Sequence, residues 1–329
     1  MSENRLSFSP ILVTGASGQL GRRLVPRLLA AGYQVRGHYR SKEKAAKYCP
    51  SGVEAVIGDL SRPDWLAKAV DGCQAVIHGA ARVSLRKGNF DEQYKVNVEG
   101  TRAVITACLN CNVRRLVNIS SIVTVGASSN GMPIDESAIF NLGKYNIAYI
   151  RTKREAEELA LAANGPKLEI ISVNPSIMIS PPDRAVTSRD LRKIPKFLPA
   201  YFDFGLNLVE TDDVITGIIS ALERGRPGER YLLTGENIDP EKLFEISKRY
   251  FGISKPVLKI PYSAVILLSY FVAFISKLGG RRAKLYPGFA RLGRYKFIYS
   301  HEKASRELGY HPKPLEESIK EILGKIERR

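Results

Sequence analysis

The glycine pattern near the N-terminus constrains the fold of this chain more strongly than any other feature. Thr14–Gly21 reads TGASGQLG and separates a short apolar run, Pro10–Thr14, from a helical pattern over Leu20–Ala31. Here the backbone must turn sharply, approach a pyrophosphate closely and direct a helix N-terminus at it, and side chains would obstruct all three. The motif therefore predicts a dinucleotide-binding loop that contacts its ligand through Gly15, Ser17, Gly18, Gln19, Leu20 and Gly21.

Short apolar runs alternate with helical patterns through the first half of the chain. The predicted strands are Pro10–Thr14, Tyr33–Tyr39, Glu54–Ile57, Gln74–His78, Leu116–Ile119 and Leu168–Asn174. The helical segments between them include Asp64–Val70, Phe90–Cys111 and 149–163. This alternation predicts an α/β fold with a Rossmann-like, doubly wound parallel sheet.

After Asn174 a series of prolines breaks this rhythm. We expect a dinucleotide-binding domain over residues 1–174 and a smaller, mostly helical substrate lobe over 175–329, some segments of which return to the sheet. The elements expected in the second half are Asp212–Arg224, Tyr231–Thr234, Pro240–Phe251 and Pro314–Ile326.

The end of the second strand indicates which dinucleotide is bound. An acidic residue there would bind the adenosine ribose hydroxyls of NAD, but the segment from Arg36 contains no carboxylate before Glu43. Arg40 could hold a 2′-phosphate through two parallel hydrogen bonds, which favours NADP over NAD; the alternative is an ordinary surface arginine. Asp59 and Leu60 follow the third strand, where Asp59 would bind the adenine amino group or would instead cap the next helix near Arg62.

A tyrosine and a lysine four residues apart suggest proton chemistry. Tyr149 and Lys153 would share one face of a helix, and a nearby ammonium lowers the pKa of a phenol towards the working pH. Lys153 can also hydrogen-bond the nicotinamide ribose. Ser121, with Ser120 as its neighbour or alternate, ends the preceding strand and would hold the substrate oxygen; alternatively, both serines only terminate the strand.

These motifs resemble the extended short-chain dehydrogenases/reductases, and within them the branch of 3β-hydroxysteroid dehydrogenases and dihydroflavonol reductases. The likeness also includes HGAA at 78–81, VNVEGT at 96–101, NPS at 174–176, VETDDV at 209–214 and LGY at 308–310. It implies a Rossmann fold, with Tyr149 as general acid/base, Lys153 as its activator and Ser121 as substrate donor. It also places Arg40 at the phosphate-binding arginine and adds cofactor contacts from Ala80, Ala81, Asn97, Ile119, Pro175 and Ser176.

Two positions depart from the pattern of this family. Ser180 replaces the usual glycine before Pro181, and Val125 replaces a tyrosine that many sugar-nucleotide epimerases carry. The second departure argues against a sugar-nucleotide substrate. The resemblance also suggests a homodimer formed by the helices around Phe90–Cys111 and Tyr149–Ala163.

The most apolar stretch of the chain precedes its most basic one. Residues 260–276 (IPYSAVILLSYFVAFIS) carry no charge, and 277–296 contain seven basic residues and no acidic one. The apolar run is shorter than the roughly 20 residues of a membrane span. Three interpretations stay open: a buried helix of the substrate lobe, a peripheral membrane contact through 260–296, and a true span.

The net charge of +17 indicates an anionic partner, because 50 basic residues face 33 acidic ones. Residues 241–329 hold 19 Lys and Arg against 8 Asp and Glu, beside the apolar run, which favours a membrane surface over nucleic acid. A solvated basic face is the alternative. Four cysteines are too few for a disulfide framework, and Cys108 and Cys111 are read as helix packing with no metal site. The N-terminus lacks the apolar run of a signal peptide, so we expect a cytoplasmic protein, with membrane association as an open alternative.

The sequence favours an NADP(H)-dependent oxidoreductase that interconverts a ketone and a secondary alcohol on a hydrophobic, sterol-like or polycyclic small molecule. One alternative is a nucleotide-sugar 4-epimerase or dehydratase with tightly bound NAD. Another is a dinucleotide-binding protein without catalysis, although such proteins usually lose the Tyr–Lys pair that is intact here.

Overall fold

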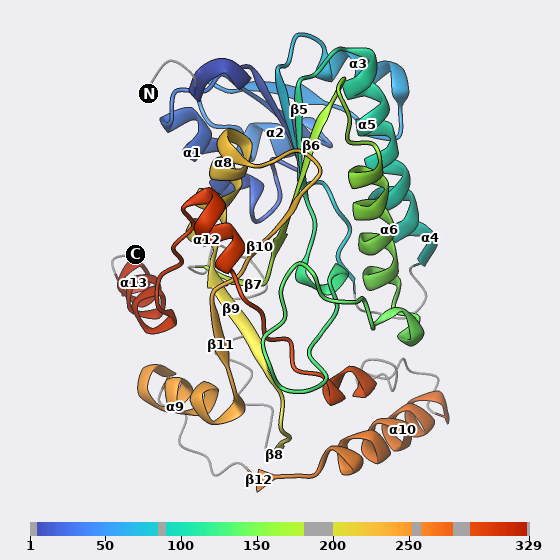
Figure 1. Ribbon diagram of the computed structural model, residues 1–329, viewed down its shortest axis with the longest axis vertical. Helices are drawn as coiled ribbons and strands as arrows, with labels where there is room; N and C mark the ends of the chain where they lie inside the picture. The colour runs from blue at the N-terminus through green and yellow to red at the C-terminus, as the bar shows by residue number, and fades with distance from the viewer. Residues whose placement is uncertain (1–4, 85–89, 181–199, 252–257, 279–289, 328–329) are drawn as a thin grey trace.

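The computed structural model describes residues 5–84, 90–180, 200–251, 258–278 and 290–327 (Figure 1). The prolines predicted to punctuate 181–199 and the basic residues of 279–289 therefore lie outside the described residues.

Seven parallel strands form the central sheet in the order β10-β6-β5-β4-β1-β2-β3. They are β1 (Ile11–Thr14), β2 (Val35–Tyr39), β3 (Glu54–Ile57), β4 (Ala75–His78), β5 (Arg115–Ile119), β6 (Glu169–Pro175) and β10 (Arg230–Leu233). The six strands predicted from the first half of the sequence all pair here, and the Rossmann-like fold is confirmed.

Helices cover both faces of this sheet because its central strands are apolar on both sides. In β1, Ile11 and Val13 point into one core and Leu12 points into the other. The first core packs against α1 (Gly21–Ala30), α8 (Thr211–Arg224) and α12 (Glu302–Leu308). The second packs against α3 (Pro63–Val70), α5 (Gly100–Asn110) and α6 (Ala148–Ala162), which stand together on one side in Figure 1.

Two helical segments differ from the expectation. The predicted helix Phe90–Cys111 consists of α4 (Phe90–Tyr94), a π-helical turn (Lys95–Glu99) and α5. The helix α2 (Lys42–Tyr48) was not predicted. Its sequence KEKAAKY buries only Ala45, so it carries no apolar periodicity, and it begins at Ser41, whose side chain accepts a hydrogen bond from the Lys44 N–H.

The substrate lobe lies beyond one end of the central sheet (Figure 1). It contains α9 (Pro240–Phe251), α10 (Tyr262–Leu278) and α13 (Leu315–Glu327), together with two small sheets. One consists of β11 (Glu236–Ile238), β9 (Leu206–Glu210) and β7 (Ile177–Ile179), and the other of β12 (Leu258–Lys259) and β8 (Ala200–Tyr201).

The two predicted domains are interleaved in the structure. The boundary after Asn174 falls within β6, and both β10 and α8, which come later in the chain, complete the central sheet and one of its helical layers. Segments beyond residue 174 thus return to the sheet, as the sequence indicated.

Helix α10 is not a buried helix. Leu267 is 74% exposed and Phe271 is 61% exposed, so the first of the three interpretations of this apolar run is wrong. Among the described residues, no helix has the length and apolar character needed to cross a bilayer.

Candidate active site

The predicted site residues gather at the edge of the sheet where its strands end. Because the strands are parallel, the segments that follow β1, β2, β4, β5 and β6 all leave the sheet at this edge. The chain runs from β1 through α1 to β2 on one side, while β4 pairs with β1 on the other. Such a reversal opens a crevice at the strand ends, which is where open α/β sheets bind ligands.

The glycine loop between β1 and α1 is packed too tightly for side chains. Gly15 adopts φ +75°, and a Cβ atom there would lie 3.0 Å from the Ala80 Cα. A Cβ on Gly21 would lie 2.3 Å from the Gly15 carbonyl oxygen. The Gly18 N–H donates to that same oxygen at 2.8 Å. No side chain caps α1, although the N–H groups of Arg22 and Arg23 donate to the carbonyl oxygens of Gly18 and Leu20 at 3.0 and 3.1 Å. The glycine backbone before the helix leaves room for a pyrophosphate at the helix N-terminus, as the sequence predicted.

The next wall of the crevice is tied to this loop by Thr14 and His78. Thr14 Oγ1 accepts hydrogen bonds from the N–H groups of Gly79 and Ala80, each at 3.2 Å, and lies 2.8 Å from His78 Nδ1. The other ring nitrogen of His78 lies 3.1 Å from Thr101 Oγ1. Burial lowers the pKa of His78 to about 3, so its ring is neutral and has a structural role.

Asn97 stabilises the same wall from the π-helical turn. Its Oδ1 accepts from the Arg82 N–H at 2.7 Å, and its Nδ2 donates to the Arg82 carbonyl and to Thr152 Oγ1. Asn97 therefore joins the segment that follows Ala80 and Ala81 to helix α6. Asn97 is itself buried, so these hydrogen bonds are shielded from water.

Arg40 and Asp59 lie near one another at the ends of β2 and β3. The Arg40 side chain is exposed, and Asp59 Oδ1 accepts a hydrogen bond from the Ser61 N–H at 2.9 Å. That hydrogen bond is the main cause of the lowered pKa of Asp59, and the charge of Arg40 lowers it further. Asp59 thus forms a local turn with Ser61 before α3, whose N-cap is Arg62 and has no side-chain cap hydrogen bond, and Leu60 beside it is buried.

Tyr149, Lys153 and Ser121 come together between α6 and the end of β5. Tyr149 and Lys153 lie on successive turns of α6, and Lys153 Nζ donates to the Ile119 carbonyl oxygen at 2.8 Å. The Ser121 side chain lies near Tyr149 and acts to lower the pKa of its phenol. Burial raises the pKa of Tyr149, and burial lowers the pKa of Lys153 to about 8, against the opposing effect of the Glu157 charge.

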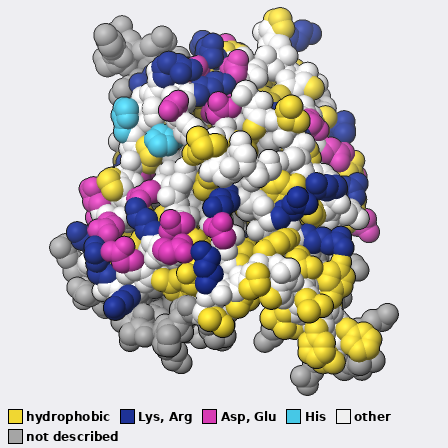
Figure 2. All heavy atoms as spheres, turned by 60° about the horizontal axis from the view of Figure 1, so that its bottom comes forward, with side chains coloured by type: hydrophobic (Ala, Val, Ile, Leu, Met, Phe, Trp, Pro, Cys, Tyr) yellow, Lys and Arg dark blue, Asp and Glu magenta, His cyan; other side chains and the backbone are white. Residues whose placement is uncertain are grey.

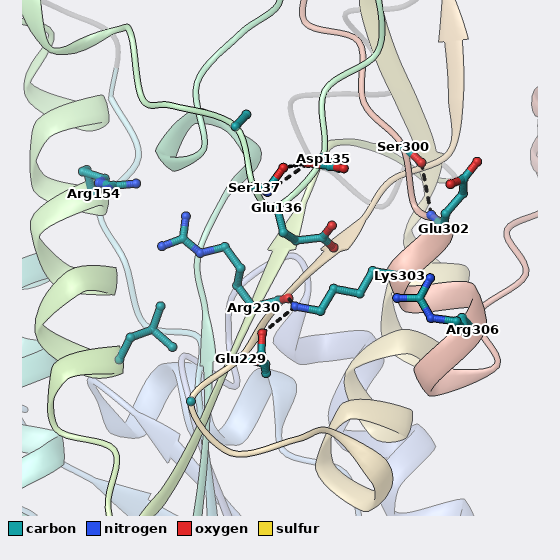
Figure 3. A pocket seen from close by; sticks show the side chains of 13 residues that line it. Asp135, Glu136, Ser137, Arg154, Glu229, Arg230, Ser300, Glu302, Lys303 and Arg306 are labelled. Atoms are coloured by element: carbon teal, nitrogen blue, oxygen red, sulfur yellow. Dashed lines mark hydrogen bonds and ion pairs between the residues drawn. The ribbon is translucent and has the colours of Figure 1, made fainter.

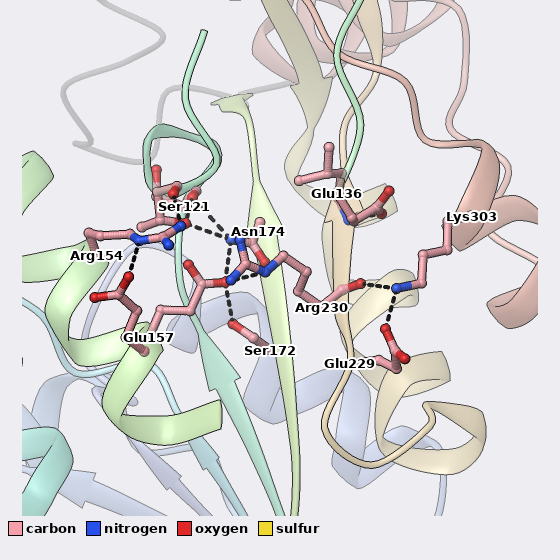
Figure 4. Close-up of polar contacts among 12 residues, drawn as sticks. Ser121, Glu136, Arg154, Glu157, Ser172, Asn174, Glu229, Arg230 and Lys303 are labelled. Atoms are coloured by element: carbon pink, nitrogen blue, oxygen red, sulfur yellow. Dashed lines mark hydrogen bonds and ion pairs between the residues drawn. The ribbon is translucent and has the colours of Figure 1, made fainter. Parts of the chain in front are cut away.

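A buried polar network behind this triad was not predicted from the sequence. Asn174 Nδ2 donates to Glu157 Oε1 at 2.8 Å, to Thr124 Oγ1 at 2.9 Å and to the Ser121 carbonyl at 3.1 Å (Figure 4). Ser172 Oγ also donates to Glu157 Oε1. Glu157 follows Lys153 by four residues on α6, and this spacing is the signal that could have identified it.

Three more serines lie at the crevice. Gln19 of the glycine loop donates to Ser180 Oγ at 3.3 Å, so the position where the family usually has glycine contacts the loop. The hydroxyls of Ser120 and Ser176 are buried and have no hydrogen-bond partner among the described residues. Unpaired buried hydroxyls at the ends of β5 and β6, next to Pro175, fit a site that awaits a polar ligand.

Two cavities lie away from these residues. One of about 550 Å³ borders the edge strand β10, and its lining includes four acidic and four basic side chains (Figure 3). Some of these charges pair within the cavity, as Lys303 does with Glu229. The other, of about 590 Å³, lies beside α10 and is lined in part by Tyr145, Tyr262 and Ile266. No residue predicted to bind the cofactor or to act in catalysis lines either cavity.

Comparisons with known proteins agree with this geometry. A sequence model of the NAD dependent epimerase/dehydratase family matches residues 11–233. A protein of Synechocystis sp., provisionally named dihydroflavonol 4-reductase, is 30% identical over 94% of this chain and 92% of its own length. The 4-hydroxy-2-methyl-3-oxo-4-farnesyl-3,4-dihydroquinoline-1-oxide ketoreductase of Stigmatella aurantiaca is 31% identical, with 91% and 90% covered. Sterol demethylase protein B of Methylococcus capsulatus is 33% identical, with 76% and 77% covered.

A solved structure extends the likeness to three dimensions. The crystal structure of gox2253 matches this chain with a TM-score of 0.82 and 30% identity, over 97% of this chain and 98% of the other. The family match spans more than half of the chain and includes the glycine loop and the Tyr149–Lys153 helix. The chain therefore belongs to the NAD-dependent epimerase/dehydratase family, among the extended short-chain dehydrogenases/reductases, and is an oxidoreductase of that group.

Proposed function

We propose that this protein is an NADP(H)-dependent oxidoreductase that interconverts a ketone and a secondary alcohol on a hydrophobic, polycyclic or sterol-like substrate. The observation that supports the reaction type is the convergence of Ser121, Tyr149 and Lys153 between α6 and the end of β5, at the same sheet edge as the glycine loop. The dinucleotide, when bound, supplies or accepts the hydride.

The three side chains divide the remaining work. Tyr149 gives a proton to the substrate oxygen in reduction and takes one in oxidation. Burial raises the pKa of its phenol, whereas the sequence suggested a lowered value, so the phenol is protonated at neutral pH and depends on the charge of Lys153 to release its proton. Ser121 orients the same oxygen. Lys153, with a pKa of about 8, remains mostly charged at pH 7 and stabilises the phenolate that forms when Tyr149 loses its proton.

Arg40 supports NADP as the dinucleotide. Arg40 is exposed at the end of β2, and its charge lowers the pKa of Asp59, which follows the neighbouring strand β3. The segment from Arg36 to Lys42 contains no acidic residue that could bind the ribose hydroxyls of NAD. A guanidinium in this place is suited to a 2′-phosphate, whereas the ribose hydroxyls of NAD are usually bound by a carboxylate.

A hydrophobic substrate is supported by the names of two relatives and by the lobe itself. One relative is a ketoreductase of a farnesylated quinoline and another is a sterol demethylase protein. In this chain Val125 is fully buried where sugar-nucleotide epimerases often carry tyrosine, and the lobe carries an apolar helix, α10.

The test is a comparison of the wild type with Tyr149→Phe. Purified protein is assayed for NADPH oxidation with a panel of hydrophobic ketones, and dinucleotide binding is measured by fluorescence titration. We expect wild-type turnover with at least one ketone, and a loss of about 100-fold or more in Tyr149→Phe with nearly unchanged dinucleotide affinity.

Two results would overturn the proposal. Undiminished ketone reduction by Tyr149→Phe would remove Tyr149 from the chemistry. Turnover of a uridine diphosphate sugar, with retained NAD and no ketone reduction, would instead identify a nucleotide-sugar epimerase.

A further inference from the structure

Helix α10 presents a continuous apolar surface that the described residues leave uncovered. Figure 2 shows hydrophobic side chains gathered at the lower right, on the side where α10 lies, with Lys and Arg side chains along the upper margin. The exposed side chains of this apolar face are Leu267, Leu268, Tyr270, Phe271, Phe274 and Ile275. Phe271 and Phe274 expose 61% and 60% of their surface, although aromatic side chains of this size usually lie in a core or an interface.

The opposite side of α10 is anchored to the protein. The Tyr262 hydroxyl donates to the Arg291 carbonyl oxygen at 3.0 Å, and Ser269 is fully buried. At the margin of the apolar face, the Arg291 guanidinium donates to the Tyr270 hydroxyl. These contacts fix which face of the helix points outward.

Basic groups border the apolar face. Arg291 and Arg294 are exposed on the short 3₁₀ helix Arg291–Arg294 that packs beside α10, and the Arg291 guanidinium carbon lies 5.7 Å from the centre of the Tyr270 ring. Among the described basic groups near them, Lys296 pairs with Asp203 and Lys259 pairs with Glu241, both at partly exposed positions. In the sequence, the whole stretch from 277 to 296 contains seven basic residues and no acidic one.

This combination of apolar and basic groups fits an anionic lipid surface. A second copy of the chain would satisfy the apolar side chains but would bring two basic margins of the same sign together. Anionic headgroups instead lie at the depth where the arginines flank the helix, while the acyl chains below them accept Phe271 and Phe274. We propose that α10 lies flat in the interface of a negatively charged bilayer, with its apolar face inserted and Arg291 and Arg294 on the headgroups.

The place of α10 in the fold connects this docking surface with the active site. The cavity of about 590 Å³ beside α10 is lined in part by Tyr145 and Tyr262, and Tyr145 and Tyr149 both pack against one apolar cluster that includes Leu292. A lipophilic molecule dissolved in the bilayer would therefore meet the protein on the side that leads to Tyr149. This last step rests on the proposed function, whereas membrane docking does not.

The experiment is sedimentation of the purified full-length protein with vesicles of phosphatidylcholine alone and of phosphatidylcholine mixed with phosphatidylserine, at low and at high salt. We expect the wild type to sediment with the mixed vesicles at low salt and much less with phosphatidylcholine alone or at high salt. The double variant Phe271→Glu/Phe274→Glu should remain in the supernatant. Arg291→Gln/Arg294→Gln should bind the mixed vesicles about 30-fold more weakly.

A matched control separates insertion from a change in charge. Met132 and Ile139 are also exposed, at 65% and 91%, and belong to the segment after β5 and not to α10, so Met132→Glu/Ile139→Glu makes the same charge change outside that helix. This control should sediment as the wild type does. Dinucleotide binding by each variant reports that it is folded, and this readout is independent of any substrate.

Three results would overturn the proposal. The wild type could stay in the supernatant with both kinds of vesicle, or Phe271→Glu/Phe274→Glu could sediment normally. Light scattering could also show a wild-type dimer that Phe271→Glu/Phe274→Glu converts to a monomer, without vesicle binding, and the face would then be an interface between copies. Vesicle binding without any ketone reductase activity would leave docking intact and contradict only the proposed function.

Discussion

The ammonium of Lys153 lies inside the protein, where 6% of the residue is exposed, and it donates to the carbonyl oxygen of Ile119 at 2.8 Å. Removal of this charge from water lowers the pKa of Lys153 from 10.5 to about 8. The folded state therefore binds a proton at this site less readily than the unfolded state does. A buried ammonium group with a lowered pKa reduces the free energy of unfolding at neutral pH. Lys153 is nevertheless present beside Tyr149 and Ser121.

Lys153→Met should make this cost measurable in the protein without dinucleotide. The wild type gains stability as the pH rises from about 8 to 10.5, because in this window the unfolded state still binds a proton at Lys153 and the folded state does not. The stability advantage of Lys153→Met over the wild type should therefore shrink by about 3 kcal/mol across the window. Urea denaturation at several pH values measures it.

The exposed Lys44→Met on α2 serves as the control, and its difference from the wild type should stay constant over the same range. A pH-independent difference for Lys153→Met would show that Lys153 titrates as it does in water.

Arg40 permits a second prediction at the level of one side chain. Arg40→Ala should weaken the binding of NADPH by about 10- to 100-fold, the magnitude of a charge-assisted contact, and should leave NADH nearly unchanged. Fluorescence titration with both dinucleotides measures the two affinities. Lys44→Ala removes a charge of the same sign from the neighbouring helix and should affect neither dinucleotide; an equal loss of both in Arg40→Ala would refute the preference for NADP.

At the level of elements, Asn174 joins three parts of the fold. It lies in β6 and is fully buried, and its single amide donates to Glu157 of α6, to Thr124 and to the segment that contains Ser121. The helix that supplies Tyr149 and Lys153 is thereby held to the strand end that supplies Ser121. We interpret Asn174 as a positioning residue, because its amide reaches the Ser121 backbone and no reacting atom.

Asn174→Leu should lower kcat by about 10-fold or more and change the KM for the dinucleotide little, since Ser121 would lose its support while the glycine loop stays intact. Steady-state kinetics measures both constants. Ser172→Ala is the matched control: it removes another hydrogen bond to Glu157 from the same face of β6 but does not touch the Ser121 segment. If Ser172→Ala lowers kcat as much as Asn174→Leu does, the network acts through Glu157 and not through the position of Ser121.

At the level of the whole molecule, the first and second halves of the chain are held together by contacts between segments that lie far apart in the sequence. Arg23 of α1 forms two hydrogen bonds with the Asp212 carboxylate of α8, the shorter of them 2.6 Å. Glu136, in the segment after β5, accepts from the Leu232 N–H of β10 at 2.8 Å. Such pairs follow from the tertiary fold, and no local pattern in the sequence predicts them.

This distinction explains what the sequence could and could not predict. The strands of the central sheet and the glycine loop were predictable because apolar runs and glycine spacing are local properties, and the Tyr149–Lys153 pair because a helix brings residues four apart together. The short strands of the lobe were not predicted, and helix α2 was missed because Ala45 is its one buried residue. The Asn174–Glu157 network was missed because its members meet only when β6 packs against α6. The exposure of α10 could not be predicted, because an apolar run in the sequence does not indicate whether other parts of the protein cover it.

The position of β10 in the central sheet has a consequence for folding of the protein during its synthesis. β10 is the outermost strand beside β6, and it comes from residues 230–233, long after the glycine loop and the catalytic helix have been synthesised. A nascent chain that ends at Asn174 would have unpaired backbone groups along β6 and no α8 over one face of its sheet. Such an open edge is a template for pairing with a neighbouring chain. The dinucleotide-binding half is therefore not a portable module, and a gene cut after residue 174 would encode an aggregating fragment.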